Sequence, residues 1–380
     1  MKIAIFDYKV IPTNPIGGCH LRLISELYKE HDITVFAVEF ENPCPERIKW
    51  VRIPLPTRPL VLLFLLYHLF APIIFFMYSI FTKQKFDLIQ MVESKLLFGD
   101  VSYSQFCHRA YLKKHWKHSP VKGIRGILRW TNHALHSLLE PIVYRKVKQI
   151  IVPSKGLKRE LIEQYPFTAN KILVIPNPID LEKMQKPKDF DRDKFRANYS
   201  IKKEDIVLCF IALGHFERKG LPLLLKALNQ LSKENIKLFV VGGEQDLIKQ
   251  YKRYVQEVNL ANQVIFVGMQ RDVRPFLWCS DAFIFPSLYE TFSLVSFEAA
   301  AAGLPIIVTP LYGVEDYLVD KQNGILVGRN VQEILNGINY FLSLSSKDLE
   351  NMKQNAIKDT KKYSRENFLN NWRDFYKEFI

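Results

Sequence analysis

The sequence predicts an α/β protein made of two Rossmann-like halves that face one cleft. First, short apolar segments alternate with longer segments of helical periodicity almost from end to end, which is typical of parallel βαβ units. Second, a charged and weakly periodic passage at 183–205, preceded by a strand that prolines terminate, divides this alternation into two similar halves. Third, 380 residues, 48% of them hydrophobic, suffice for two or three domains and argue against disorder.

Each half supplies its own strands and helices. Gly17-Gly18 is expected in the turn between the first strand and the first helix, and Ser154 is expected to cap the helix after the strand at 149–154. The expected strands are at 2–6, 33–40, 86–92, 101–106, 149–154, 172–180, 206–213, 236–243, 264–268, 282–287 and 304–310. The expected helices include 19–30, 59–82, 156–165, 221–233, 244–258, 273–280 and one from about Ser293 to Gly303.

Most of the net charge of +14 lies in one segment. From Arg109 to Arg159 there are 13 basic residues and a single acid, Glu140, which gives a local balance of +12. A field concentrated in this way attracts a polyanion, such as nucleic acid, anionic lipid or an acidic polymer. The alternative interpretation is a pair of helices whose solvated faces are basic.

An uncharged stretch precedes this basic segment. The 24 residues 59–82 contain no Asp, Glu, Lys or Arg and are long enough to span a bilayer. They lie between two expected strands of one sheet, at 33–40 and 86–92, and a membrane crossing would place those strands on opposite sides. We therefore expect a helix that packs on its own domain and is partly immersed in a membrane interface. The alternative is a wholly internal core helix.

Neither disulfides nor metal sites are expected. The five cysteines are scattered and lack a CxxC pair, which predicts reduced thiols in a cytosolic compartment. His115/His118 and His133/His136 have helical spacing, but no carboxylate or thiolate set accompanies them in the sequence. The DxD string at 189–193 lies in the charged passage and is interpreted as solvated surface.

Two carboxylates flank a predicted helix start in the second half. A strand ends at Pro286, a turn carries Glu290, and the following helix carries Glu298. The backbone N–H groups of 291–294 are expected to point beyond the carboxyl end of the strand, where they favour an anion such as a diphosphate. The two carboxylates then suit the hydroxyls of a nucleotide sugar. Alternatively, Glu290 caps the helix and Glu298 forms a surface salt bridge.

A second cluster contains two adjacent cations. Arg218 and Lys219 lie in 214–220, between an expected strand and a helix. At this edge of a sheet they can neutralise a developing diphosphate leaving group. An ordinary basic turn is the alternative. Gly17-Gly18 permits a close backbone approach by a ligand, but it lacks the full GxGxxG pattern.

Together these clusters resemble the retaining glycosyltransferases of family 4, which have the GT-B fold. The most specific element is Glu290-x7-Glu298 within PSLYETFSLVSFEAAAAGLP. Supporting matches are ERKG at 217–220, IPNPID at 175–180, the Gly17-Gly18 loop, Gly268, and the final helical segment SRENFLNNWRDFYKEF.

The resemblance implies roles for individual residues. Arg218 and Lys219 bind the diphosphate, Glu290 and the neighbouring backbone contact the donor sugar, and Glu298 holds the ribose. His108 falls where the family often has a histidine near the reacting sugar, while His215 and Ser293 stand where an arginine and a glycine are common. The implied catalytic set is His108, Arg218, Lys219 and Glu290. The implied donor-binding set is Gly17, Gly18, His215, Thr291, Phe292, Ser293, Leu294 and Glu298.

The resemblance also implies the domain roles and the partners. Residues 1–176, completed by the helix 364–380, form an acceptor domain, and residues 177–363 form the donor domain. The expected function is transfer of a sugar from a nucleotide-diphosphate sugar, UDP- or GDP-linked, to a lipid-linked or saccharide hydroxyl. No metal, no further cofactor and no nucleic acid are expected. The expected location is the inner face of the cytoplasmic membrane, in contact with anionic lipid. The alternatives are a GT-B nucleotide-sugar epimerase and a basic nucleic-acid-binding protein.

Overall fold

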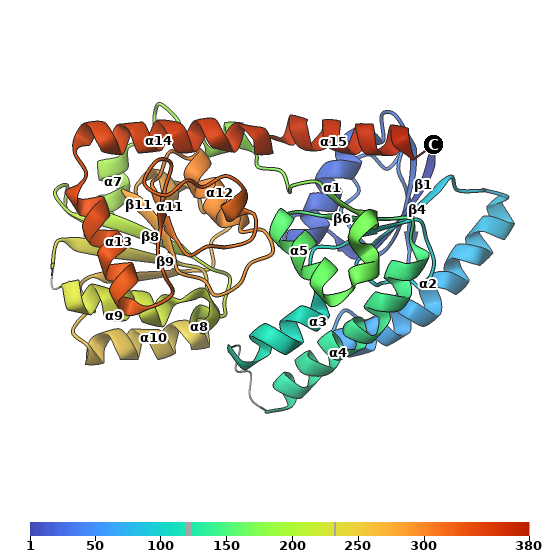
Figure 1. Cartoon of the computed structure of the whole chain (residues 1–380), viewed down its shortest axis with the longest axis horizontal. Coiled ribbons are helices and arrows are strands. Elements are labelled where there is room, and N and C mark those ends of the chain that lie inside the picture. The colour runs from blue at the N-terminus through green and yellow to red at the C-terminus, as the bar shows by residue number, and fades with distance from the viewer. Residues whose placement is uncertain (119–122, 232, 380) are drawn as a thin grey trace. The chain divides into compact units, whose positions relative to one another are not determined.

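The computed structural model describes residues 1–118, 123–231 and 233–379, and the chain folds as two compact units (Figure 1). Unit 1 comprises Met1–Asn177 and Phe368–Ile380, and unit 2 comprises Pro178–Asn367. The sequence places the corresponding divisions after residues 176 and 363. Each unit contains one parallel sheet with helices, so the predicted α/β class is confirmed.

Unit 1 is built on a seven-stranded parallel sheet with the order β3-β2-β1-β4-β5-β6-β7. Sequence patterning missed the edge strand β3, because its four residues are mostly exposed and carry no buried alternation. The strands are β1 Lys2–Val10, β2 Asp32–Phe40, β3 Lys49–Arg52, β4 Leu88–Val92, β5 Val101–Tyr103, β6 Gln149–Val152 and β7 Ile172–Val174.

Caps define where the helices of unit 1 begin. The side chain of Asn14 accepts hydrogen bonds from the amides of Ile16 and Gly17, so α1 starts at Pro15. Gly17-Gly18 therefore lies inside the first helical turn, and the expected turn position is wrong. Ser154 caps α5 as predicted, by accepting from the Leu157 amide at 3.1 Å. The helical segments are α1 Pro15–Leu27, α2 Leu60–Thr82, α3 His108–Ala110, a π-turn Tyr111–His115, a 3₁₀ turn Trp116–His118, α4 Gly123–Lys146, α5 Lys155–Gln164 and a 3₁₀ turn Pro166–Lys171.

The C-terminal helix α15 (Arg365–Glu378) returns to unit 1 and completes its core. Phe368, Trp372, Phe375 and Tyr376 are buried and belong to the same hydrophobic cluster as the strands of the unit 1 sheet. The Tyr376 hydroxyl also donates to Gln90 on β4 at 2.8 Å. The fold of unit 1 thus depends on a segment far away in the sequence.

A chain of buried polar groups continues from Tyr376 through the sheet. The Gln90 amide nitrogen lies 2.9 Å from His20 Nε2, and His20 Nδ1 lies 3.4 Å from the Asp7 carboxylate. Lys95 Nζ donates to Asp7 at 2.5 Å. Burial would raise the pKa of Asp7, but Lys95 and His20 together hold it below its ordinary value. These pairings satisfy polar groups that would otherwise be costly to bury.

Unit 2 is built on a six-stranded parallel sheet with the order β10-β9-β8-β11-β12-β13. The reversal of strand order at β8/β11 brings the loops after these two strands to the same edge. The strands are β8 Ile206–Ile211, β9 Ile236–Val241, β10 Val264–Gly268, β11 Ala282–Phe285, β12 Ile306–Val308 and β13 Ile325–Leu326. The α-helices are α6 Leu181–Met184, α7 Arg192–Ala197, α8 Phe216–Lys219, α9 Leu221–Leu231, α10 Gln245–Glu257, α11 Arg274–Trp278, α12 Leu294–Ala301, α13 Val331–Ser343 and α14 Ser346–Thr360.

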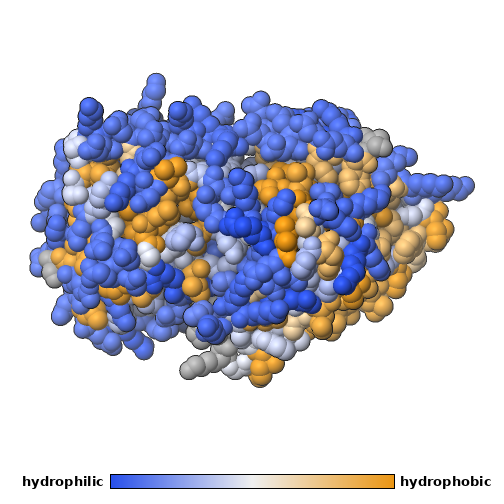
Figure 2. Space-filling model, viewed as in Figure 1, coloured by the Kyte–Doolittle hydropathy of each residue, from blue (hydrophilic) through white to orange (hydrophobic). Residues whose placement is uncertain are grey.

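The apolar helix α2 is only half covered. Its buried side chains are Leu63, Phe64, Tyr67, Ala71 and Phe75, and α4 packs against it. Many of its other apolar side chains are exposed, up to 73% at Ile80 and 79% at Phe81. The interpretation as a wholly internal core helix is therefore wrong. By length and composition α2 is also long and apolar enough to cross a membrane. Figure 2 shows hydrophobic residues gathered along α2, at the lower right.

Candidate active site

In unit 2 the two charged clusters of the sequence meet. Lys219, the last residue of α8, donates a hydrogen bond to the carboxylate of Glu290, which lies in the loop after β11. Arg218 Nη1 is 3.6 Å from the same carboxylate, and the Ser287 hydroxyl donates to it at 2.8 Å. All three charged side chains are about 15% exposed or less. Glu290 is therefore the counter-ion of the cationic pair, and the alternative that it caps α12 is wrong.

The ionisation of this cluster follows from burial and pairing. Burial alone would raise the pKa of Glu290, but Lys219 and Arg218 hold it below its ordinary value. Burial lowers the pKa of the Lys219 ammonium, and Glu290 offsets part of this effect. Two cations against one carboxylate leave the cluster with a net positive charge, which suits an anionic ligand.

Backbone geometry brings α8 to the end of β11. Gly220 has a φ of 87°, and a Cβ at this position would lie 2.1 Å from the carbonyl oxygen of Pro286. Only glycine permits this approach. The Leu288 amide donates to the Arg218 carbonyl at 2.9 Å, and the Arg218 guanidinium donates to the Tyr289 carbonyl. The two loops are thus held together by main-chain contacts as well as by the ion pair.

The start of α12 has fewer free donors than expected. The Leu294 amide donates to the Phe292 carbonyl at 2.8 Å, so the expectation that every amide from 291 to 294 is free is wrong. The Ser293 hydroxyl bonds to Ser296 at 2.8 Å and does not cap the helix. In the described part of the chain, the amides of Phe292, Ser293 and Val295 have no hydrogen-bond acceptor. These three remain available for an anion.

The remaining donor-side residues take varied positions. Thr291 and Glu298 are half-buried, in the loop and on α12 respectively, whereas His215 is exposed with a φ of 55°. The Phe292 ring stacks on Phe297 at 4.4 Å within the core, so only its backbone can face a ligand.

The structure adds Arg329, which sequence reasoning missed. It follows β13, and its Nη2 donates to the Glu217 carbonyl on α8 at 3.0 Å. Burial lowers the pKa of Arg329, and Arg218 lowers it further. No motif surrounds this arginine. The one feature of the sequence that could have indicated a site residue was its position just beyond the carboxyl end of a strand.

The glycines of α1 have a structural purpose. A Cβ on Gly17 would lie 1.7 Å from the Lys9 carbonyl oxygen, and one on Gly18 would lie 3.2 Å from that of Pro12. The chain itself occupies the space that was assigned to a ligand beside Gly17. Gly17 is therefore required for packing the start of α1 against the end of β1.

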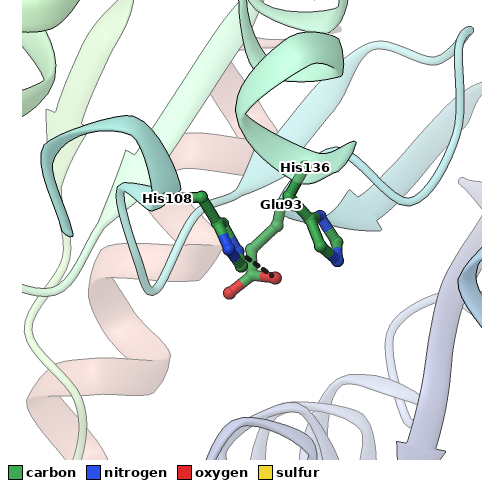
Figure 3. A group of neighbouring side chains, drawn as sticks. All are labelled: Glu93, His108 and His136. Carbon is green, nitrogen blue, oxygen red and sulfur yellow. Dashed lines mark hydrogen bonds and ion pairs between the residues drawn. The ribbon is translucent and has the colours of Figure 1, made fainter. Parts of the chain in front are cut away.

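In unit 1, His108 lies in a cluster of titratable residues. It begins α3 and is buried, with Nε2 at 3.4 Å from Glu93 Oε2. Its Nδ1 lies 2.9 Å from His133 Nδ1, and the His136 ring stacks on it with centroids 4.2 Å apart and planes 11° apart. Figure 3 shows the side chains of Glu93, His108 and His136 close together, with a dashed line that joins the His108 ring to the Glu93 carboxylate. The sequence predicted His108 but not these neighbours.

Glu93, His108 and His136 also form a group that could hold a metal ion, because their ligand atoms lie within 4.8 Å of one another. The expectation that no carboxylate accompanies His136 is therefore wrong. However, the two imidazoles are nearly parallel, so their in-plane lone pairs do not converge on one point as tetrahedral coordination requires. The ammonium of Lys95 lowers the pKa of His136 further, and it would also repel a cation. These side chains do not fit a metal in this arrangement.

Two family models match the chain. Residues 20–183 match the model described as Glycosyltransferase Family 4, and residues 191–359 match the one described as Glycosyl transferases group 1. An uncharacterised glycosyltransferase of Methanocaldococcus jannaschii is 27% identical over 99% of this chain and 98% of its own length. The UDP-Gal:alpha-D-GlcNAc-diphosphoundecaprenol alpha-1,3-galactosyltransferase of Escherichia coli is 24% identical over 75% of each chain. Anabaena HepE in complex with UDP has a TM-score of 0.75 at 18% identity, over 100% of both chains.

The two parallel sheets and the matched models define a glycosyltransferase with the GT-B fold. The two models match different parts of the chain, which is a glycosyltransferase of the family 4 type. The resemblance drawn from the motifs is thereby confirmed.

Replacing Lys219 by Ala is expected to reduce turnover about 10²–10³-fold, because the resemblance implies that this cation binds the leaving diphosphate. Steady-state transfer and donor hydrolysis measure this effect. Lys226→Ala, an exposed lysine on the neighbouring helix α9, is the matched control. Unchanged transfer in Lys219→Ala would contradict the site assignment.

The buried histidines predict a loss of stability in acid. Burial, together with His108 and Arg129, lowers the pKa of His133 to about 2, so the unfolded state takes up its proton first as the pH falls below 6.5. Because the pKa of His133 is lower in the folded state than in the unfolded state, its contribution to stability is complete above pH 6.5 and declines below it. Urea unfolding at pH 7.5 and 5.5 should show a loss of about 1.4 kcal/mol from this residue. Between the same two pH values, the His133→Gln variant should lose about 1.4 kcal/mol less stability than the wild type. An identical loss in the variant and the wild type would contradict a lowered pKa of His133.

Proposed function

We propose that this protein moves a sugar from a nucleotide-diphosphate sugar to a hydroxyl acceptor with retention of the anomeric configuration. The observation that carries the proposal is the meeting of Arg218, Lys219 and Glu290 at the edge of the unit 2 sheet. A leaving diphosphate develops negative charge as its bond to the sugar breaks, and fixed cations stabilise that charge without a metal. This arrangement supports a metal-independent transferase.

In the proposed reaction the bond from the anomeric carbon to the diphosphate oxygen breaks, and a bond to the acceptor oxygen forms on the same face. The acceptor proton passes to the departing phosphate. Arg218 and Lys219 stabilise that phosphate, the unbonded amides at the start of α12 bind it, and Glu298 holds the ribose. Glu290 orients the donor sugar, and His108 contacts it near the reacting carbon.

The donor is proposed to be a UDP-sugar. HepE was solved with UDP, and the Escherichia coli relative is named for UDP-Gal. A GDP-sugar is the other candidate from the sequence. The acceptor is proposed to be lipid-linked, because the same relative is named for a diphosphoundecaprenol-linked acceptor. We propose a role in the synthesis of a cell-surface polysaccharide or glycolipid precursor.

The surface of unit 1 supports membrane attachment. Helix α4, which packs against α2, also exposes apolar side chains, with Ile124 76% exposed and Leu138 65% exposed. Basic residues of the segment 109–159 accompany them. Exposed apolar side chains in a unit with a basic segment fit an anionic leaflet, to which each basic residue near the surface contributes about 1 kcal/mol. We propose a peripheral location on the inner face of the cytoplasmic membrane.

A screen of UDP-, GDP- and ADP-sugars by thermal shift identifies the donor, because a ligand of the folded state raises the melting temperature. The identified donor is then incubated with a lipid-linked acceptor, and the ¹H coupling constant of the new linkage is measured by NMR. We expect the α or β configuration of the donor to persist in the product. An inverted product, or a new epimer formed from donor alone, would reject the proposal.

Membrane attachment is tested by co-sedimentation with anionic vesicles at low salt. The double variant Leu65→Gln/Leu69→Gln removes two side chains that are 51% and 56% exposed on α2, and it should weaken binding about tenfold. Leu213→Gln in unit 2, where the side chain is 63% exposed, is the matched control. If the wild type stays in the supernatant, or if the control loses as much binding as the double variant, attachment through α2 is wrong.

A further inference from the structure

Helix α4 has two faces of opposite character. His133, His136 and Glu140 follow the i, i+3, i+7 spacing of one helical face, and all three lie against His108 or its backbone. On the other face, Leu138 and Ile142 are 65% and 43% exposed. In an ordinary amphipathic helix the buried face is apolar. The buried face of α4 instead carries three polar side chains, and all three contact His108.

Glu140 is the single acid of the basic segment 109–159, and its side chain is completely buried. Its carboxylate accepts hydrogen bonds from the His108 amide at 2.6 Å and from the Arg109 amide at 3.2 Å. These amides begin α3, so they have no partner within their own helix. The Tyr165 hydroxyl donates to the same carboxylate at 2.5 Å. Glu140 thus fixes the backbone from which the His108 side chain projects.

The His108 ring is held by further contacts. His133 Nδ1 lies 2.9 Å from its Nδ1, and Glu93 Oε2 lies 3.4 Å from its Nε2. The ring of His136 covers one side of the imidazole, and the Ser94 hydroxyl in turn fixes His136 Nδ1 at 2.9 Å. Burial raises the pKa of Glu140, and its contacts with His108 and Tyr165 offset only part of this effect. His108 consequently has little freedom of backbone or ring.

We propose that Glu140 is a positioning residue for the reaction, which acts by holding the start of α3 so that His108 keeps its orientation. The inference rests on the proposed role of His108 as a group near the reacting sugar. A group displaced by about 1 Å can lose about 10²-fold in rate, so a contact to the backbone of His108 is sufficient to govern turnover.

The test compares Glu140→Gln with Glu160→Gln. Glu160 is an equally buried carboxylate on α5, and it lies 3.9 Å from His115 Nε2. Glutamine keeps the shape of residue 140 but has one acceptor oxygen for two amides. We expect kcat to fall about tenfold or more in Glu140→Gln, with donor KM within about twofold, and to stay near wild type in Glu160→Gln. Tyr165→Phe, which leaves both amide bonds in place, should also keep kcat.

A double-mutant cycle with His108→Ala connects the effect to the histidine. Glu140→Gln should add little to the loss already seen in His108→Ala, because both changes remove the same function. Equal losses of kcat in the wild-type and His108→Ala backgrounds would overturn the proposal, since Glu140 would then act by another route. Full activity of His108→Ala would instead reject the proposed role of His108, and the positioning role would fall with it.

A second measurement does not depend on activity. In protein labelled with ¹⁵N-histidine, the ring signals that disappear in His108→Ala belong to His108. We expect these signals to shift in Glu140→Gln and to remain in place in Glu160→Gln. Unshifted His108 signals in a folded Glu140→Gln protein would overturn the proposal even if the sugar-transfer reaction is as proposed.

Discussion

The ion pair between Lys219 and Glu290 is the interaction on which the donor-side geometry depends. It joins the loop after β8 to the loop after β11, at the point where the strand order of the unit 2 sheet reverses. Breaking a buried pair by removing one partner typically costs about 3–5 kcal/mol, because the other charge stays buried without its partner. The pair therefore holds the two loops together, and it keeps Lys219 in place next to the position proposed for the anionic ligand.

In unit 1 the buried polar side chains are stabilised by several kinds of partner. Asp7 on β1 and Lys95 in the loop after β4 form a buried ion pair. Burial and neighbouring cations lower the pKa values of His133 and His136. Glu140 is satisfied by two amides and a hydroxyl. Buried polar groups are tolerated only where partners are in place, so these residues constrain one another. Because the buried histidines are neutral in the folded state, unit 1 is expected to lose stability when the pH falls far enough for the unfolded state to bind their protons.

Sequence patterning predicted the α/β class, most of the strands, the last helix and the family, because period and turn chemistry are local properties. It also placed Arg218 and Lys219 between one strand and the following helix, and Glu290 in the turn after another strand. It missed β3, because an exposed edge strand carries no hydrophobic signal, and it misjudged Gly17, whose neighbour is the chain itself and not a ligand. Arg329 and Glu140 were missed because their partners, on α8 and α3, are distant in the sequence.

Helix α4 has a consequence for how sequence variation in this protein should be interpreted. Its exposed apolar positions lie about one helix diameter, roughly 10 Å, from the side chains that surround His108. A substitution at Leu138 or Ile142 changes an exposed residue on the face of α4 opposite these side chains. If the proposal holds, a resulting shift of the helix would displace His108 through His133, His136 and Glu140. In a mutational scan, an activity loss at such a surface position would therefore not imply damage to the donor site, because displacement of the histidine or weaker membrane attachment also lowers turnover.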